Sequence, residues 1–128
     1  MFAYDPNKQP DAQKWLDLPE SNRMLAVEKY HKVNRIKLPN ARGHAAFHVM
    51  VENQLAEGYE PTVRAIVRLV NEGLTRHDAV HAVGSAVSEQ LFNAMKAEQA
   101  DPPEITQALV SAAIERLTAK TWLEQFKS

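Results

Sequence analysis

Several residue types and patterns are absent from this chain of 128 residues. It has no cysteine, which excludes disulfides, cysteine-based zinc sites, iron–sulfur clusters and a thiol nucleophile. The formal net charge is −1, so no basic surface for nucleic acid or an anionic membrane is predicted. No eighteen apolar residues occur in a row, and the start "MFAYDPNKQPDAQKW" lacks the pattern of a secretion signal. We expect a cytoplasmic protein without nucleic-acid or membrane partners, in which histidines and carboxylates must hold any metal.

The remaining composition favours helices. Only four glycines occur, alternating Val/Ile/Thr runs are missing, and alanine, leucine, glutamate, glutamine and lysine recur. We predict an all-α protein, a single-domain helical bundle of five to six helices that spans residues 1–128. Residues 101–128 are expected to form a C-terminal extension helix that packs on the bundle or on a dimer partner. The apolar tail with Trp122 and Phe126 favours a homodimer.

Prolines and glycines divide the helical pattern into segments. The segments expected to be helical are about 10–18, 21–34, 41–57, 61–72, 75–100 and 104–126, the last with a break near Thr118. Gly58 and Gly73 suit the left-handed position that follows a helix. The Thr75 hydroxyl is expected to cap the longest helix, with Asp78 returning the bond.

The histidines carry the main functional signal. Five occur, and four of them form two pairs spaced four residues apart, His44 with His48 and His77 with His81. Five histidines placed at random would give roughly 0.15 such pairs. The spacing stacks both rings of a pair on one helix face, so each pair can present two imidazoles to one point.

Both pairs are predicted to face the interior. His44 and His48 share a helical arc with Phe47, Val51 and Leu55, and Glu52 lies at the edge of that arc. His77 and His81 share theirs with Val80, Gly84, Ser88, Leu91 and Met95. The small Gly84 and Ser88 would allow another helix to approach closely.

Convergence of the two pairs would create a metal site. Four neutral imidazoles, from His44, His48, His77 and His81, suit zinc. Glu52 as an oxygen ligand extends the choice to iron, manganese or nickel, and its alternative role is that of a supporting partner of a ligand. His31 is an outer ligand candidate. The sequence identifies no small-molecule ligand and no reaction.

Two known helical iron sites share part of this pattern. Glu28 with His31, and Asp78 with His81, have the acid-x-x-His spacing of di-iron bundles, although the cap at Thr75 explains Asp78 better. A ferritin-like site also needs two further inward glutamates, and only Glu52 qualifies. The order of a histidine, then His48 with Glu52, then His77 with His81 is similar to that of the iron ligands in hemerythrins. No histidine follows His81, so the closing ligands of that pattern are missing.

Two other functions are compatible with the histidines. One is a non-enzymatic interaction or regulatory module, in which the rings form a buried hydrogen-bond network. The other is a metal-dependent hydrolase, which needs an open coordination position and a base such as Glu52. The helical His-Glu-x-x-His hydrolases are not matched, because Ala45, Ala46 and Phe47 separate the first pair.

The remaining conspicuous side chains favour structural roles. Arg64, Arg68 and Arg76 lie near Glu60, Glu72 and Asp78 in the sequence, which indicates solvated ion pairs. The aromatic residues at amphipathic positions are predicted to be core or interface anchors: Trp15, Phe92, Trp122 and Phe126.

A further resemblance, to a protein family, rests on three blocks of the sequence: "WLDLPESNRMLAVEKYH", "LPNARGHAAFHVMVENQLA" and "LVNEGLTRHDAVHAVGS". Over about residues 15–92 the chain resembles a family of small bacterial proteins classed as a domain of unknown function. The resemblance implies that one feature contains His31, His44, His48, Glu52, His77 and His81. It implies no established activity, and the tail from about Asp101 lies outside it.

Overall fold

The computed structural model describes residues 2–34, 41–97, 99 and 101–127. These residues form helices and no strand, which confirms the all-α prediction. The helices are α1 (Ala12–Asp17), α2 (Glu20–Val33), α3 (Ala41–Ala56), α4 (Glu60–Asn71), α5 (Arg76–Lys96), α6 (Pro103–Arg116) and α7 (Ala119–Lys127). Within the described residues, no helix is long and apolar enough to cross a membrane.

The boundaries follow the local signals in the sequence. Gly58 and Gly73 have positive φ angles of 74° and 109°, where a side chain would strain the backbone. The Thr75 hydroxyl accepts from the Asp78 backbone N–H at 3.0 Å and caps α5. A break does occur near Thr118, whose hydroxyl accepts from the Thr121 backbone N–H at 3.1 Å and starts a new helix. The described residues therefore contain seven helices, one more than the upper number predicted.

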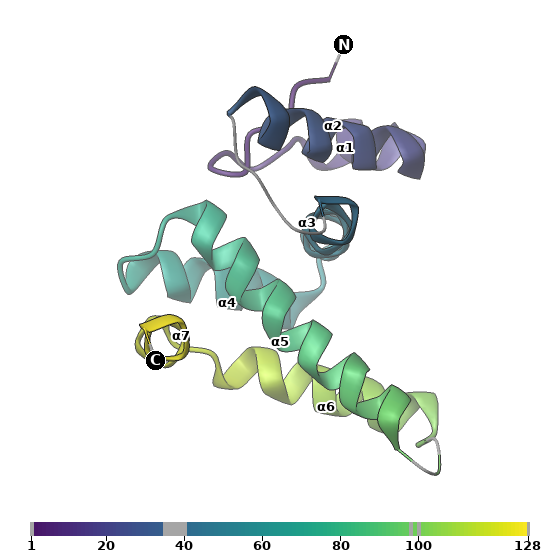
Figure 1. The fold of residues 1–128 in the computed structure, drawn as a ribbon, viewed down its shortest axis with the longest axis vertical. Helices are drawn as coiled ribbons and strands as arrows, with labels where there is room; N and C mark the ends of the chain where they lie inside the picture. The colour runs from purple at the N-terminus through teal and green to yellow at the C-terminus, as the bar shows by residue number, and fades with distance from the viewer. Residues whose placement is uncertain (1, 35–40, 98, 100, 128) are drawn as a thin grey trace.

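Helix α3 occupies the middle of the molecule. It lies between a layer formed by α1 and α2 and a layer formed by α4 and α5, and it contacts all four (Figure 1). Helix α6 packs against α4 and α5 on the far side, and α7 turns sharply away from α6. Helix α3 therefore connects the two layers.

Two groups of buried apolar side chains flank α3. Its Ala45 and Val49 belong to a smaller core, which also contains Tyr4, Trp15 and Val27. Its Val51 and Leu55 belong to a larger core built mainly from α4, α5 and α6. On a helix of 3.6 residues per turn, the stripe of His44, His48 and Glu52 lies between these two faces. The polar stripe is thus placed where α2, α3 and α5 meet.

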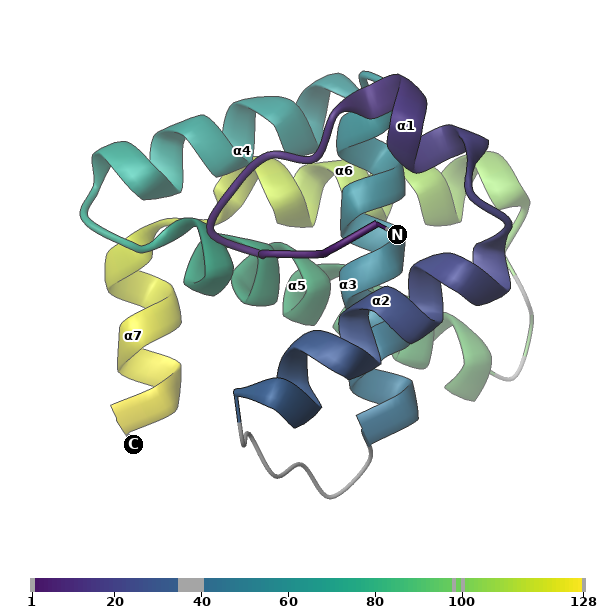
Figure 2. The same ribbon diagram turned by 90° about the horizontal axis from the view of Figure 1, so that it is seen from above.

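The N-terminal segment before α1 covers the start of α5. Figure 2 shows this purple segment running past α5 before it turns toward α1. Arg76 donates to the Pro6 carbonyl at 2.7 Å, and the His77 backbone N–H donates to Asn7 Oδ1 at 3.1 Å. Tyr4 is only 6% exposed. This segment therefore closes one side of the histidine region.

The C-terminal residues pack on the rest of the chain. Val110 and Ile114 of α6 and Trp122 of α7 are buried in the larger core. Trp15, another predicted anchor, is fully buried in the smaller core, whereas Phe92 is 58% exposed. Because Trp122 is already covered, it offers little surface to a second copy of the chain. The side chain of Phe126 lies outside the described residues.

Candidate metal centre

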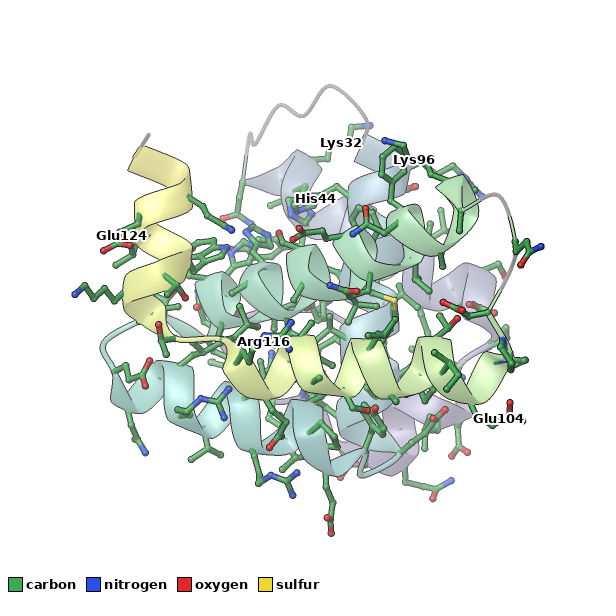
Figure 3. The ribbon with its side chains drawn as sticks, turned by 90° about the horizontal axis from the view of Figure 1, so that it is seen from below. Lys32, His44, Lys96, Glu104, Arg116 and Glu124 are labelled. Carbon is green, nitrogen blue, oxygen red and sulfur yellow. The ribbon has the colours of Figure 1, made fainter. Side chains whose placement is uncertain are left out.

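All five histidines of the chain meet at one place. One ring nitrogen from each of His31, His44, His48, His77 and His81 lies within 4.8 Å of the corresponding nitrogen of every other. Helix α2 supplies the first, α3 the next two and α5 the last two. Figure 3 shows the labelled His44 in the region where these helices come together. The two predicted pairs converge, and His31 joins them.

His48 lies at the centre of the group. Its Nε2 is 3.1 Å from His44 Nε2 and 3.0 Å from His81 Nε2. Nitrogen ligands about 2.0–2.1 Å from an ion stand about 2.8–3.4 Å apart at octahedral to tetrahedral angles. The observed spacings therefore match those of nitrogens that share one ion.

The hydrogen bond of Tyr4 determines which nitrogen of His48 carries the proton. The Tyr4 hydroxyl donates its single proton to Glu52 Oε2 at 2.6 Å. Its oxygen also lies 3.0 Å from His48 Nδ1, and it must accept there, so Nδ1 carries the hydrogen. Nε2 of His48 is left with a lone pair that faces the other histidines. This is the form of imidazole that binds a metal.

His31 adopts the same tautomer as His48, with the hydrogen on Nδ1, for a different reason. Its Nδ1 donates to the Val27 carbonyl one helical turn earlier, at 2.9 Å. Its Nε2 therefore carries a lone pair, and this atom is buried without a hydrogen-bond partner. Nε2 of His77 is also buried and has no partner. Buried nitrogens without partners are costly, and an ion among them would satisfy both.

Glu52 lies behind His48 and not among the five ring nitrogens. Arg76 forms two hydrogen bonds with its carboxylate, Nη2 to Oε1 at 2.7 Å and Nη1 to Oε2 at 2.8 Å, and Tyr4 donates to Oε2. Both oxygens are thus engaged. Of the two predicted roles for Glu52, ligand or supporting partner, this geometry corresponds to the supporting one.

The arginines differ from the prediction of solvated ion pairs. That prediction is wrong for Arg76, since its side chain is 10% exposed and that of its partner Glu52 is 1% exposed. It is also wrong for Arg68, which donates to the carbonyls of Ile114 and Leu117. Of these three arginines, Arg64 forms the exposed ion pairs, with Glu60 and Glu115. Arg76 and Arg68 instead contact segments that are close in space but distant in the sequence.

Glu28, the acid of the predicted di-iron motif, does not join the histidines. Its carboxylate lies 3.7 Å from Arg42 on α3. Asp78 serves the α5 cap through its backbone N–H. Within the described residues, the group that can hold a metal contains histidines alone.

Burial and mutual proximity favour the neutral form of several histidine rings. Burial first, and then the neighbouring histidines, lower the pKa of His44 to about 4 and that of His81 to about 3. The same two causes, burial first, place the pKa of His48 still lower. Burial and then the Glu52 charge raise the pKa of Tyr4, so its hydroxyl stays protonated. At neutral pH the ring nitrogens can act as ligands.

A pocket of about 570 Å³ opens beside the cluster. Its lining residues come from α3 and α5: His44, Phe47, His48, Val80, His81, Gly84, Ser85 and Ser88. A Cβ atom at Gly84 would lie 3.5 Å from Phe47 Cβ and 3.7 Å from Val51 Cγ2, so α3 does approach α5 closely here, as predicted. His31 and His48 are buried, whereas His44, His77 and His81 are partly exposed. The cluster thus has a closed side and an accessible side.

Sequence reasoning missed two groups that support the site. Tyr4 belongs to a polar, proline-marked segment, and nothing in its spacing links it to a histidine. Arg76 is adjacent to His77, but its contact with Glu52 spans 24 residues. For Arg76 the available signal was its position beside His77 at a predicted helix start, which is too common to identify a site. For Tyr4 the sequence held no such signal.

Comparison of the chain with protein-family models, with curated proteins and with solved structures found no match. The resemblances to a small bacterial family and to hemerythrins therefore stay predictions. What supports a function is the geometry of the five histidines.

Proposed function

We propose that this protein binds one divalent transition-metal ion through His31, His44, His48, His77 and His81. The observation that carries the proposal is the convergence of five ring nitrogens within 4.8 Å, from three helices. The hydrogen bonds of His48 and His31 leave their lone pairs available to an ion. Neutral rings with bare nitrogens are what a metal requires of histidine.

The donor set narrows the choice of metal. Because Arg76 and Tyr4 occupy both oxygens of Glu52, the ligands offered are imidazoles alone. Imidazole suits zinc, nickel and iron, whereas manganese prefers oxygen ligands. Of the metals predicted from the sequence, zinc, nickel and ferrous iron are therefore favoured over manganese. A bound ion would supply Lewis acidity and an attachment point for a further ligand.

A metal-free hydrogen-bond network is the competing explanation. It accounts for the contacts of His48 with His44 and His81, since a neutral ring can donate one hydrogen to the bare Nε2. It leaves Nε2 of His31 and Nε2 of His77 buried without partners. Two unsatisfied nitrogens in one cluster favour the metal over the network.

A hydrolase receives less support. The pocket does give access to the histidines, as such an enzyme requires. None of the described residues that line it is a carboxylate, and Glu52 is held by Arg76 on the other side of His48. A water in the pocket would therefore lack a nearby general base. Metal binding without an assigned reaction is the function we propose.

The test is metal analysis of protein purified without a histidine tag. We expect about one ion per chain after reconstitution with zinc, and a loss of affinity of more than about tenfold in His48→Ala and in His81→Ala. Thr62→Val is the control, because Thr62 is a fully buried polar residue that bonds Gln54, outside the cluster. Substoichiometric metal that neither histidine change alters would contradict the proposal.

A further inference from the structure

The pocket beside the histidines has the features of a ligand site. We infer that it binds a small organic monocarboxylate, with the carboxylate on the metal and the apolar body against the pocket wall. This inference rests on the proposed metal site. It adds the chemical class of the ligand, which metal binding alone leaves open.

The pocket reaches the cluster at only some of the rings. His44, His48 and His81 line it, whereas His31 and His77 do not. His31 is 4% exposed and closes the opposite side together with the N-terminal segment. A ligand that enters the pocket therefore meets the metal-binding nitrogens from one direction.

The charge around the site favours an anion. Five neutral imidazoles leave the two positive charges of a divalent ion uncompensated. Glu52, the acid of the supporting network, is already paired with Arg76. None of the described lining residues carries a carboxylate that would compete for the ion. An incoming anion supplies the missing negative charge.

The pocket wall favours an apolar body with a single charge. Phe47, which is 45% exposed, contributes most of the apolar surface, and Val80 and Gly84 line the pocket as well. The Ser88 hydroxyl donates to the Gly84 carbonyl at 2.6 Å, which reduces its polarity toward the pocket. None of the described residues that line the pocket is a lysine or an arginine that could pair with a second negative charge. A dicarboxylate or a phosphate ester is therefore less suitable than a monocarboxylate.

The size of the pocket is consistent with such a ligand. Its volume of about 570 Å³ lies within the range of about 300–1,000 Å³ that is usual for small-molecule sites. A simple aromatic acid fits this volume, and acetate would leave most of it unfilled. The pocket size therefore predicts that a carboxylic acid with an aromatic ring binds more tightly than acetate.

The test uses cobalt(II) as a visible probe in the untagged full chain. The cobalt-loaded protein is titrated with benzoate, acetate and benzamide, and the change in its visible spectrum is followed. We expect benzoate to bind at least about tenfold more tightly than acetate or benzamide. Benzoate that binds no better than benzamide would overturn the requirement for an anion. Benzoate that binds no better than acetate would overturn the role of the pocket wall.

Two variants locate the ligand in the pocket. Ser88→Phe fills the pocket and should keep one cobalt per chain while it weakens benzoate at least about tenfold. Ser21→Phe, at an exposed position on α2, is its control and should leave benzoate binding unchanged. Phe47→Ala should weaken benzoate and leave acetate unchanged, which provides a second test that does not require a larger side chain.

The outcomes separate this inference from the proposed function. If the chain takes up cobalt but its visible spectrum does not change with benzoate, the inference alone is overturned. The inference alone is also overturned if the benzoate affinity stays the same in both Ser88→Phe and Phe47→Ala. A chain that takes up no cobalt overturns both.

Discussion

Tyr4 Oη lies 3.0 Å from His48 Nδ1, although 44 residues separate them in the chain. The hydroxyl gives its proton to Glu52, so it accepts the hydrogen of His48 and leaves Nε2 bare. A residue of the N-terminal segment thus controls the protonation of the most central histidine. Supporting partners of this kind hold the ring orientation and raise the basicity of a histidine ligand.

Removal of the Tyr4 hydroxyl is expected to lower the affinity of the site for metal. Tyr4→Phe keeps the ring in the smaller core but leaves His48 Nδ1 without an acceptor. Loss of such a partner lowers metal affinity about 10- to 100-fold, which competition with a chelator of known affinity would measure. Tyr59→Phe is the control, since the Tyr59 hydroxyl bonds Ser111 and Gln107 away from the cluster. Equal zinc affinity in both variants would contradict the role of Tyr4.

The pair formed by Glu52 and Arg76 should be important for stability. Glu52→Gln leaves the buried guanidinium of Arg76 without its counter-charge, and breaking a buried pair costs about 3–5 kcal/mol. Urea denaturation of the metal-free protein gives the free energy of unfolding. Glu115→Gln removes an exposed partner of Arg64 and should cost less than about 1 kcal/mol. A similar decrease in the free energy of unfolding in the two variants would show that the buried pair stabilises the fold no more than the exposed pair.

The metal-free protein should lose stability in mild acid. The folded pKa values of His44 and His81, about 4 and about 3, lie below the ordinary value of 6.5, so the unfolded chain binds protons more readily. The stabilising effect is complete above pH 6.5 and is lost as the pH falls toward those folded values. Urea midpoints measured between pH 7 and pH 4 should fall steadily. His44→Asn should show a shallower decline, and an equally steep one would contradict this account.

Metal should raise the stability of the folded chain. An ion that binds only the folded state adds about 2.7 kcal/mol when its free concentration is 100 times Kd. Thermal unfolding with zinc, and again after a chelator is added, measures the difference. We expect a higher Tm with zinc and a return to the metal-free value with the chelator. A Tm that responds to neither would favour the hydrogen-bond network without metal.

The close approach of α3 and α5 predicts a size limit at Gly84. A Cβ there meets its nearest neighbours at 3.5 Å and 3.7 Å, which are ordinary contacts. Gly84→Ala should therefore fold normally and gain up to about 1 kcal/mol from its better helix propensity. Gly84→Leu must push the helices apart and should cost about 1–3 kcal/mol and weaken zinc binding. Equal stability of the two variants would contradict this contact.

Local properties of the sequence were sufficient to predict most of the fold. Helix propensity, the spacing of apolar residues, Gly58, Gly73 and the Thr75 cap act within a few neighbouring residues, so they can be read without knowing the packing. The same holds for the histidine pairs, because a spacing of four places two rings on one helix face wherever the helix lies. The sequence by itself thus determined the helices, their approximate ends and the inward direction of both pairs.

The partners that complete the site depended on the tertiary structure. Tyr4 meets His48 across 44 residues, Arg76 meets Glu52 across 24 and Pro6 across 70. Such contacts depend on how α2, α3 and α5 pack and on where the N-terminal segment lies, and no local spacing encodes that placement. Packing also decided that Glu52 supports His48 and that a pocket opens on one side of the rings. The chain sequence therefore specified which side chains could act, and the arrangement of helices specified which of them meet.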